Sequence, residues 1–189
     1  MTTPNTYFLE RPDWSSPIRV SRLYRTGIQK AIRSDEKRQA IFSFGRLGIR
    51  FNMTGLDYTE IAYIRRQIFK YQGGILAIPI WPDLLRIESD ANSGQKNVTV
   101  SGTTYLWFQH IGMNIVLMDP DDPTSYEVGI VASVTSTVIT LEENLVNTWE
   151  EGKEIVPVIF SRIGDGNSFQ FFTDAKGNIT IQAREAIAD

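Results

Sequence analysis

The residues that come closest to a catalytic or metal-binding arrangement are clustered carboxylates. The segment Asp119-Pro-Asp-Asp-Pro123 holds three of them, and grouped carboxylate oxygens are suitable ligands for calcium. A calcium loop of the EF-hand type also needs a central glycine and a glutamate at its twelfth position. This segment has neither, and its prolines are typical of a plain turn. The sequence therefore favours a turn here over a metal site.

Two pairs of adjacent glutamates, Glu142-Glu143 and Glu150-Glu151, could be taken for the paired acids of a glycosidase. That reaction needs two carboxyl groups ~5–10 Å apart across a sugar bond, which neighbours on one short segment do not provide. We interpret them as solvated loop charges. The segment Gly164-Asp-Gly166 begins like a dinucleotide-binding loop, but it lacks the third glycine and opens no helix.

The cysteine and histidine counts exclude much of the remaining chemistry. The chain has no cysteine, which excludes disulfides, thiolate zinc sites and cysteine nucleophiles. Its one histidine, His110, lies in an aromatic stretch, where we interpret it as a structural residue. Tryptophans scattered one per segment are typical of core or interface anchors rather than of a sugar-stacking platform; they are Trp14, Trp81, Trp107 and Trp149. We therefore expect no catalytic residues, no cofactor and no metal.

The composition is that of an ordinary globular protein. The 189 residues are 42% apolar and 22% charged, with a net charge of −3, and this balance argues against a general nucleic-acid binder. The N-terminus has no basic segment followed by an apolar core, so it does not resemble a secretory signal. The longest uncharged apolar run, residues 75–81, is far shorter than the ~20 residues of a transmembrane helix. We expect a soluble protein made in a cytoplasm.

Charge is distributed unevenly along the chain. Residues 1–70 carry a balance of +7 and residues 71–189 a balance of −10. Solvated strand faces are one explanation. The other is a basic face that docks on an acidic face, within one chain or between copies, and so sets orientation. We place Arg38, Arg46 and Arg50 on such a contact or facing the axis of an assembly, because Arg50 lies opposite the apolar side of its predicted strand.

The first third of the chain predicts several strands. In residues 47–53, Leu47, Ile49, Phe51 and Met53 share one face by strict alternation. The Gly45-Arg46 pair predicts a two-residue turn to a strand at 41–44. Weaker patterns predict strands at 18–24 and 28–32.

One helix is predicted, over residues 57–72. Asp57 and Glu60 fit a capping box, and Ile61, Ile64 and Ile68 line one face at helical spacing. Gly73-Gly74 then ends the helix, because glycine readily adopts the left-handed cap. Residues 75–81 follow as a buried strand.

The remainder of the chain is divided into short strands by turn residues. We predict strands at 84–88, 97–101, 113–118, 126–134, 138–141 and 154–162, a spacing typical of a small barrel or sandwich. The tail, residues 169–183, predicts a further hairpin around residues 174–178. The sequence thus indicates a mainly β protein with one helix.

Two stretches that together cover most of residues 24–157 contain a series of short motifs. The first runs through Tyr24-Arg-Thr26-Gly-Ile28, Ser34-Asp-Glu36-Lys-Arg38, Gly45-Arg46, the predicted helix, and Gly73 to Pro79-Ile-Trp81. The second runs through Gly112-Met-Asn-Ile-Val-Leu117, Tyr126-Glu-Val-Gly-Ile-Val131, Val138-Ile-Thr-Leu141 and Trp149-Glu-Glu-Gly152 to Pro157. With these motifs the chain resembles bacteriophage tail structural proteins of the distal tail and tail-tip family. The second stretch is similar to the small β-module that follows in many of those proteins.

The resemblance implies a tail-tube-like β-sandwich with one flanking α-helix and a small inserted β-barrel-like module. The corresponding parts are residues 1–83 with the helix, the module at 84–157, and C-terminal strands at 158–189 that return to the first part. It also implies a non-enzymatic virion protein, a distal tail or tail-tip ring subunit that links tail tube and baseplate. Its expected partners are further copies in a ring, often six-fold, and tail tube and baseplate hub proteins. A genome could pass through the lumen, with no specific nucleic-acid contact and no membrane. The alternatives are a head–tail connector or tail-completion protein, or a carbohydrate- or receptor-binding appendage.

Overall fold

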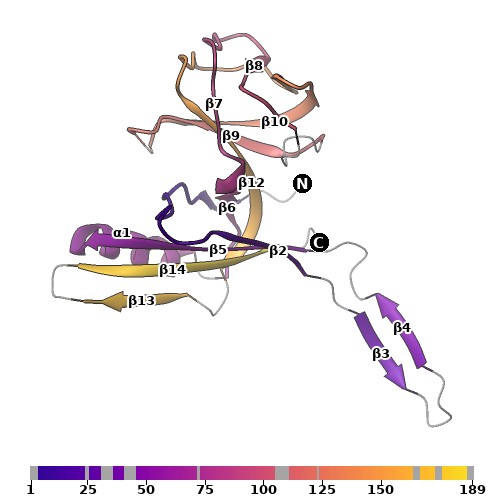
Figure 1. The fold of residues 1–189 in the computed structure, drawn as a ribbon, viewed down its shortest axis with the longest axis vertical. Coiled ribbons are helices and arrows are strands. Elements are labelled where there is room, and N and C mark those ends of the chain that lie inside the picture. Colours follow the sequence, from indigo (N-terminus) through magenta and orange to yellow (C-terminus); the bar gives the residue numbers. More distant parts are fainter. Residues whose placement is uncertain are drawn as a thin grey trace. The chain divides into compact units, whose positions relative to one another are not determined.

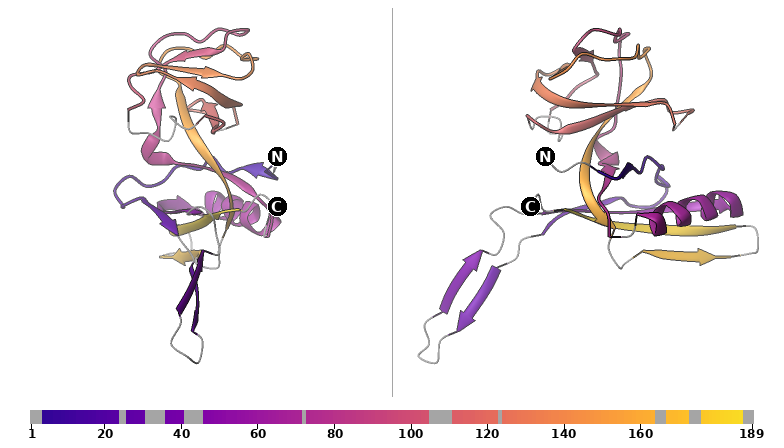
Figure 2. Two further views of the ribbon diagram at one scale, coloured as in Figure 1. Left: turned by 90° about the vertical axis from the view of Figure 1, so that its right-hand side faces the viewer. Right: turned by 180° about the vertical axis from the view of Figure 1, so that it is seen from behind.

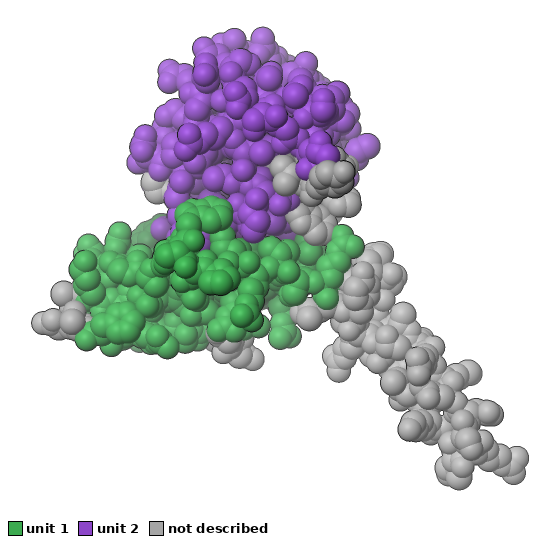
Figure 3. Space-filling model, viewed as in Figure 1, with its two compact units in different colours: residues 1, 13–74, 161–189 green, residues 2–12, 75–160 purple. Residues whose placement is uncertain are grey.

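The computed structural model describes residues 4–23, 26–30, 36–40, 46–71, 73–104, 111–122, 124–163, 167–172 and 176–186. These residues are mainly in strands, with a single α-helix among them (Figure 1), so the expected mainly β fold class is confirmed. The chain forms two compact units (Figure 3). Unit 1 comprises residue 1 and residues 13–74 and 161–189, and unit 2 comprises residues 2–12 and 75–160. No described residue belongs to a helix with the length and hydropathy needed to span a membrane.

Unit 1 is built on an open antiparallel sheet. Its elements are β2 (Arg19–Leu23), β3 (Thr26–Lys30), β4 (Glu36–Ala40), β5 (Arg46–Asp57), α1 (Tyr58–Lys70), β13 (Ser168–Phe171), β14 (Lys176–Glu185) and the end of β12 (Glu154–Ile163). Strand β5 pairs with β2 on one side and β14 on the other. Strand β14 pairs in turn with β13 and with the end of β12. Strands β3 and β4 form a separate antiparallel pair.

The predicted alternation along β5 is confirmed. Leu47, Ile49, Phe51 and Met53 are buried, while Arg50 is exposed. The predicted strand at 18–24 and the tail hairpin are present as β2 and as β13–β14. The hairpin expected around Gly45-Arg46 is wrong in its pairing, because β2 and β14 occupy both edges of β5 at residues 48–50. Residues 41–45 themselves lie outside the described part of the chain.

Helix α1 covers the apolar face of this sheet. It contacts β5 and β14 (Figures 1 and 2) and buries Ile61, Ile64 and Ile68, the face predicted from the spacing. The predicted capping box is also present: the Asp57 carboxylate accepts from the Glu60 amide, and the Glu60 carboxylate accepts from the Asp57 amide, both at 2.8 Å. The cap satisfies two amides that would otherwise lack partners, so the helix starts at one defined place on the sheet.

A β-bulge sets the register between β5 and β14. Gly177 is opposite Leu56 and Ile179 is opposite Met53, so β5 has one residue more than β14 in this interval. Gly55 takes up the extra length with φ of 71°, a left-handed conformation that favours glycine. Its amide donates to Asn178 Oδ1 at 3.2 Å. The bulge therefore has both the residue type and the hydrogen bond that it requires.

Unit 2 contains the remaining strands. They are β1 (Thr6–Tyr7), β6 (Leu76–Pro79), β7 (Leu85–Arg86), β8 (Asn97–Thr99), β9 (Asn114–Met118), β10 (Tyr126–Val134), β11 (Val138–Leu141) and most of β12, with a 3-10 turn at Trp81–Asp83. Antiparallel pairing runs in the order β12-β9-β10-β11-β8. Strand β7 pairs with β12, and an isolated bridge joins Ile87 to Val100. The predicted strands at 126–134 and 138–141 match β10 and β11.

The core of unit 2 is made of aliphatic side chains from these strands and of Trp149. Ile115, Leu117, Val131, Ile139 and Ile155 are fully buried in it. The whole of β6 is buried, as its uninterrupted apolar sequence predicts. Its last residue is Pro79, which has no amide hydrogen to donate to a neighbouring strand, so the strand ends there.

Candidate functional site

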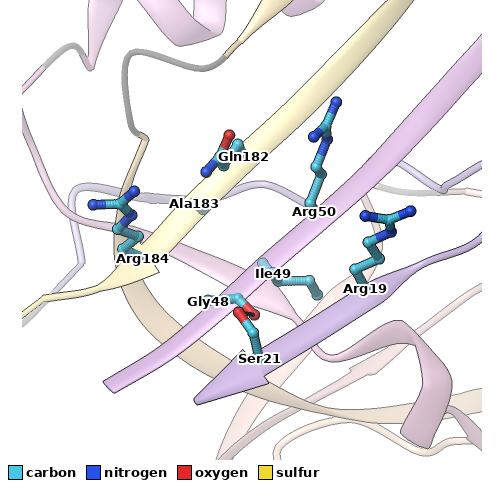
Figure 4. Close-up of a pocket in the computed structure, with 8 residues that line it drawn as sticks. All are labelled: Arg19, Ser21, Gly48, Ile49, Arg50, Gln182, Ala183 and Arg184. Atoms are coloured by element: carbon cyan, nitrogen blue, oxygen red, sulfur yellow. Dashed lines mark hydrogen bonds between the residues drawn. The ribbon is translucent and has the colours of Figure 1, made fainter. Parts of the chain in front are cut away.

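The outward side of the β2–β5–β14 sheet carries arginine side chains from three strands. Arg19, Arg50 and Arg184 are all exposed. On β5 and β14, Arg50 and Arg184 alternate with the buried residues that face α1, so they project from the opposite side of the sheet. We call this surface, with Ser21, Gly48 and Gln182 beside the arginines, the arginine face (Figure 4).

The strand register brings these residues together. Arg50 is directly opposite Arg19 on one neighbour and Gln182 on the other. In the adjacent row, Gly48 lies between Ser21 and Arg184. The side chains surround an open hollow of about 190 Å³, and Figure 4 shows the guanidinium groups rising around it. Because Gly48 has no side chain, the middle of the row formed by Ser21, Gly48 and Arg184 does not project into the hollow.

The arginine face has no internal counter-charge within the described part of the chain. There, Arg19, Arg50 and Arg184 make neither an ion pair nor a side-chain hydrogen bond. The polar bonds nearby involve other groups: Ser21 Oγ donates to the Gly48 carbonyl at 3.4 Å. Like charges placed directly across a sheet destabilise the strand pair. The arginine face is therefore suited to binding an anionic group that does not belong to the sheet of unit 1.

The three arginines predicted as contact residues lie on two different strands. Arg46 and Arg50 are on β5, where Arg46 is opposite Leu23 of β2. Arg38 is on β4 opposite Ile28, in the separate β3–β4 pair, and its side chain lies outside the described part. The structure thus brings Arg50 together with Arg19 and Arg184, which the sequence did not indicate. Their role in a contact stays a prediction.

Unit 2 carries a complementary cluster of exposed acids. Glu150 and Glu151 are exposed, and the Glu151 amide donates to Asp90 Oδ1 at 2.9 Å. Two backbone hydrogen bonds between Ala91 and Trp149, at 2.8 and 2.9 Å, hold the two segments side by side. We call Asp90, Glu150 and Glu151 the acidic turn. It is fixed by backbone bonds, so its carboxylates lie on a preformed surface.

The described part of the predicted turn, residues 119–122, connects β9 to β10, and the carboxylates of Asp119 and Asp122 have partners of their own. Asp119 accepts from Lys153 Nζ at 2.6 Å, and this bond, with one from the Asp121 amide, lowers the pKa of Asp119 below its usual value. Asp122 accepts from the Thr124 hydroxyl and amide at 2.6 and 2.9 Å. Among described residues, no group of three acidic or histidine side chains is placed to hold a metal ion.

The tryptophans, the histidine and the glycine-rich segment named in the sequence analysis are either placed by the structure or lie outside its described part. Within it, Trp81 and Trp149 are buried and Trp14 is 58% exposed, whereas His110, Trp107 and residues 164–166 are not described. Trp149 Nε1 donates to Glu127 at 2.9 Å, and the same carboxylate accepts from the amides of residues 146 and 147 at 2.6 and 3.0 Å. Glu127 therefore fixes the loop that leads to the acidic turn.

A second exposed surface lies on the outer side of α1. Tyr58, Phe69 and Phe171 are exposed and line an open hollow of about 260 Å³. The Arg65 guanidinium lies 5.4 Å from the centre of the Phe69 ring, within range of a cation–π interaction. Exposed aromatic groups of this kind mark surfaces that contact other molecules.

No protein-family model matches this sequence, and a search of the curated proteins found no match.

Proposed function

We propose that this chain is a non-enzymatic structural protein of a bacteriophage tail, a distal tail or tail-tip ring subunit that joins the tail tube to the baseplate. The sequence resemblance described above is the starting point. In this role the chain acts through its surfaces, and its partners are further copies of itself and other tail proteins in the virion.

The observation that best supports a ring subunit is the open sheet of unit 1. Among the described strands, β2 pairs only with β5 and β13 pairs only with β14, so each has a free edge. Free edges are templates for pairing with another chain. Two different edges on one subunit suit a heterologous contact, which gives a ring when the rotation closes.

The proposal includes a β-sandwich and a barrel-like module as the architecture of the two units. A tail-tube-like β-sandwich would correspond to unit 1, with α1 as the flanking helix. A barrel-like module would correspond to unit 2, where the bridge from Ile87 to Val100 links the segment after β7 to the segment after β8. Together with the order β12-β9-β10-β11-β8 and the β7–β12 pair, this bridge favours a closed arrangement.

The test is the solution mass of the purified protein by light scattering, with negative-stain imaging of the same sample. We expect a closed ring of several copies with an open centre. A monodisperse species of 21.4 kDa at every concentration would contradict the ring-subunit proposal and favour a tail-completion protein. Copy number per virion then separates a ring protein from a tube protein, because a tube contains many more copies.

A further inference from the structure

We propose that the arginine face is a carboxylate-binding surface that receives the acidic turn of a neighbouring copy of this chain. This inference rests on the proposed function, because it assigns the contact through which one subunit would recognise the next. The arginine face is Arg19, Arg50 and Arg184 with the residues beside them, on unit 1. The acidic turn is Asp90, Glu150 and Glu151, on unit 2.

The arginine face has the chemistry that recognises carboxylates. A guanidinium group presents a planar set of donors that matches the two oxygens of a carboxylate. Three such groups from three adjacent strands surround one hollow, and Gln182, in the same row as Arg19 and Arg50, adds a neutral amide. A short acidic segment could place one carboxylate in each row of the hollow.

The charges of the face lack partners in the part of the chain that the structure describes. Arg19 and Arg50 are directly opposite each other, an arrangement that destabilises the free sheet. By contrast, Arg22 and Arg46 on the same strands do have interactions. On β2, β5 and β14, the arginines without a partner in the described part are thus the ones that gather around the hollow, and an incoming carboxylate would relieve their repulsion.

The acidic turn carries a negative charge that complements the arginine face. Its three carboxylates belong to exposed residues, and its backbone is held by the paired bonds between Ala91 and Trp149. The neighbouring cation, Lys153, donates to Asp119 instead, although it lies near enough to Glu150 for their charges to interact. A rigid segment loses little conformational freedom on binding, which favours this turn over a flexible acidic tail.

The contact is directional, because the two surfaces differ. Unit 1 of one copy binds unit 2 of the next, so every subunit uses one surface of each kind. Such head-to-tail contacts form rings when the rotation closes and open filaments when it does not. The opposite signs of the two surfaces also disfavour head-to-head pairing, in which arginine would meet arginine.

The experiment uses two charge-reversed variants of the full chain. One carries Arg50→Glu and Arg184→Glu, and the other carries Glu150→Arg and Glu151→Arg. A matched control reverses two exposed cations that line neither the arginine face nor the hollow on α1, Lys70→Glu and Arg86→Glu. Circular dichroism verifies that each variant is folded, and light scattering measures the mass of each alone and of equimolar mixtures.

We expect the arginine-face variant and the acidic-turn variant each to lose assembly when alone, with association weakened at least about tenfold, while the control variant assembles like the wild type. Mixing the arginine-face variant with the acidic-turn variant should restore assembly, because the Glu residues on the face of one then meet the Arg residues on the turn of the other. Wild-type assembly should weaken from about 0.1 M to about 1 M salt, since salt screens exposed charges.

The outcomes separate this inference from the proposed function. If the folded arginine-face and acidic-turn variants assemble like the wild type, or if their mixture fails to recover, the arginine-face contact is refuted while the ring subunit stands. If the wild-type chain stays at its monomer mass of 21.4 kDa throughout, both fail. Recovery in the mixture also excludes a contact made only within one chain, because neither variant contains a matched pair.

Discussion

The ion pair between Arg11 and Glu154 provides a stringent test of how unit 2 is held together. Glu154 is the first residue of β12, and its side chain is only 4% exposed. The Arg11 guanidinium binds both of its oxygens, with Nη2 on Oε2 and with Nη1 3.4 Å from Oε1. Replacing Arg11 by methionine keeps most of the aliphatic packing and removes the charge. The buried carboxylate is then left without its partner.

The expected cost follows from burial. Breaking a fully buried pair by removing one partner costs about 3–5 kcal/mol. The Arg11 side chain is 37% exposed, so water reaches the outer side of the pair and we expect about 2–3 kcal/mol for Arg11→Met. For a chain of this length, that corresponds to a fall in melting temperature of roughly 4–12 °C.

The assay is equilibrium unfolding in urea, followed by tryptophan fluorescence. Trp81 and Trp149 are buried in unit 2 and report on that unit, while the far-ultraviolet circular dichroism signal of α1 reports on unit 1. The control is the double variant Arg11→Met with Glu154→Gln, in which no buried charge remains. It should recover at least about 1 kcal/mol of the single variant's loss, since contacting residues are energetically coupled.

Two results would refute the reasoning. If Arg11→Met lowers the free energy of unfolding by less than about 0.5 kcal/mol, the typical effect of a surface substitution, the carboxylate is solvated well enough without its partner. If the double variant is as unstable as Arg11→Met, the loss comes from packing rather than from the uncompensated charge. In either case the N-terminal segment, residues 2–12, would be held to the rest of unit 2 mainly by the β1–β6 pairing.

Three further predictions concern the surroundings of the two surfaces. Glu127→Ala removes the acceptor of three hydrogen bonds and should cost about 2–4 kcal/mol, seen as red-shifted tryptophan emission and a lower melting temperature; an unchanged melting temperature would count against it. Gly55→Ala forces a side chain into a left-handed conformation and should cost about 1–2 kcal/mol in urea unfolding. By contrast, Gly102→Ala should be close to neutral, because Gly102 has no left-handed φ and an added Cβ would make only an ordinary van der Waals contact with the Ser136 carbonyl oxygen, at 3.9 Å. The hydrogen bond from Lys153 lowers the pKa of Asp119. The stability that this bond contributes to the folded state is therefore present above the usual carboxyl pKa near 3.8, and it is lost as pH falls through the lower pKa that Asp119 has in the folded protein. When the melting temperature is measured at decreasing pH, it should therefore fall less for Asp119→Asn than for the wild type. Equal falls would argue against a stabilising bond between Lys153 and Asp119.

The elements that sequence analysis predicted best are those specified by neighbouring residues. Helix α1 has its capping box and its three buried isoleucines within a dozen residues, so its start and its buried face follow from local signals. The same holds for β10 and β11, which are bounded by turn residues. The pairing partner of β5 was predicted wrongly, because a turn-like dipeptide is only a local signal. Pairing with β2 and β14 depends on residues far away in the sequence.

The arginine face could not be predicted from the sequence for a related reason. Arg50 was recognised from the alternation of its own strand, but Arg19 and Arg184 join it only through the register of three strands that are distant in sequence. A single basic residue in a strand is an ordinary solvated charge. The distinguishing property, three like charges on neighbouring positions, exists only after the strands have paired.

That register depends on the bulge at Gly55. Without the extra residue in β5, the pairing that places Gly177 opposite Leu56 would continue unshifted, and Arg184 would lie opposite Ile49 instead of Gly48. A slip of one residue moves every side chain of a strand to the other face. The buried residues of β14 would then be matched with the exposed residues of β5. The bulge thus aligns Ile179, Ile181 and Ala183 with the apolar face that α1 covers, and the same shift brings Arg184 beside Arg50. The features that stabilise the core of unit 1 also assemble its arginine face.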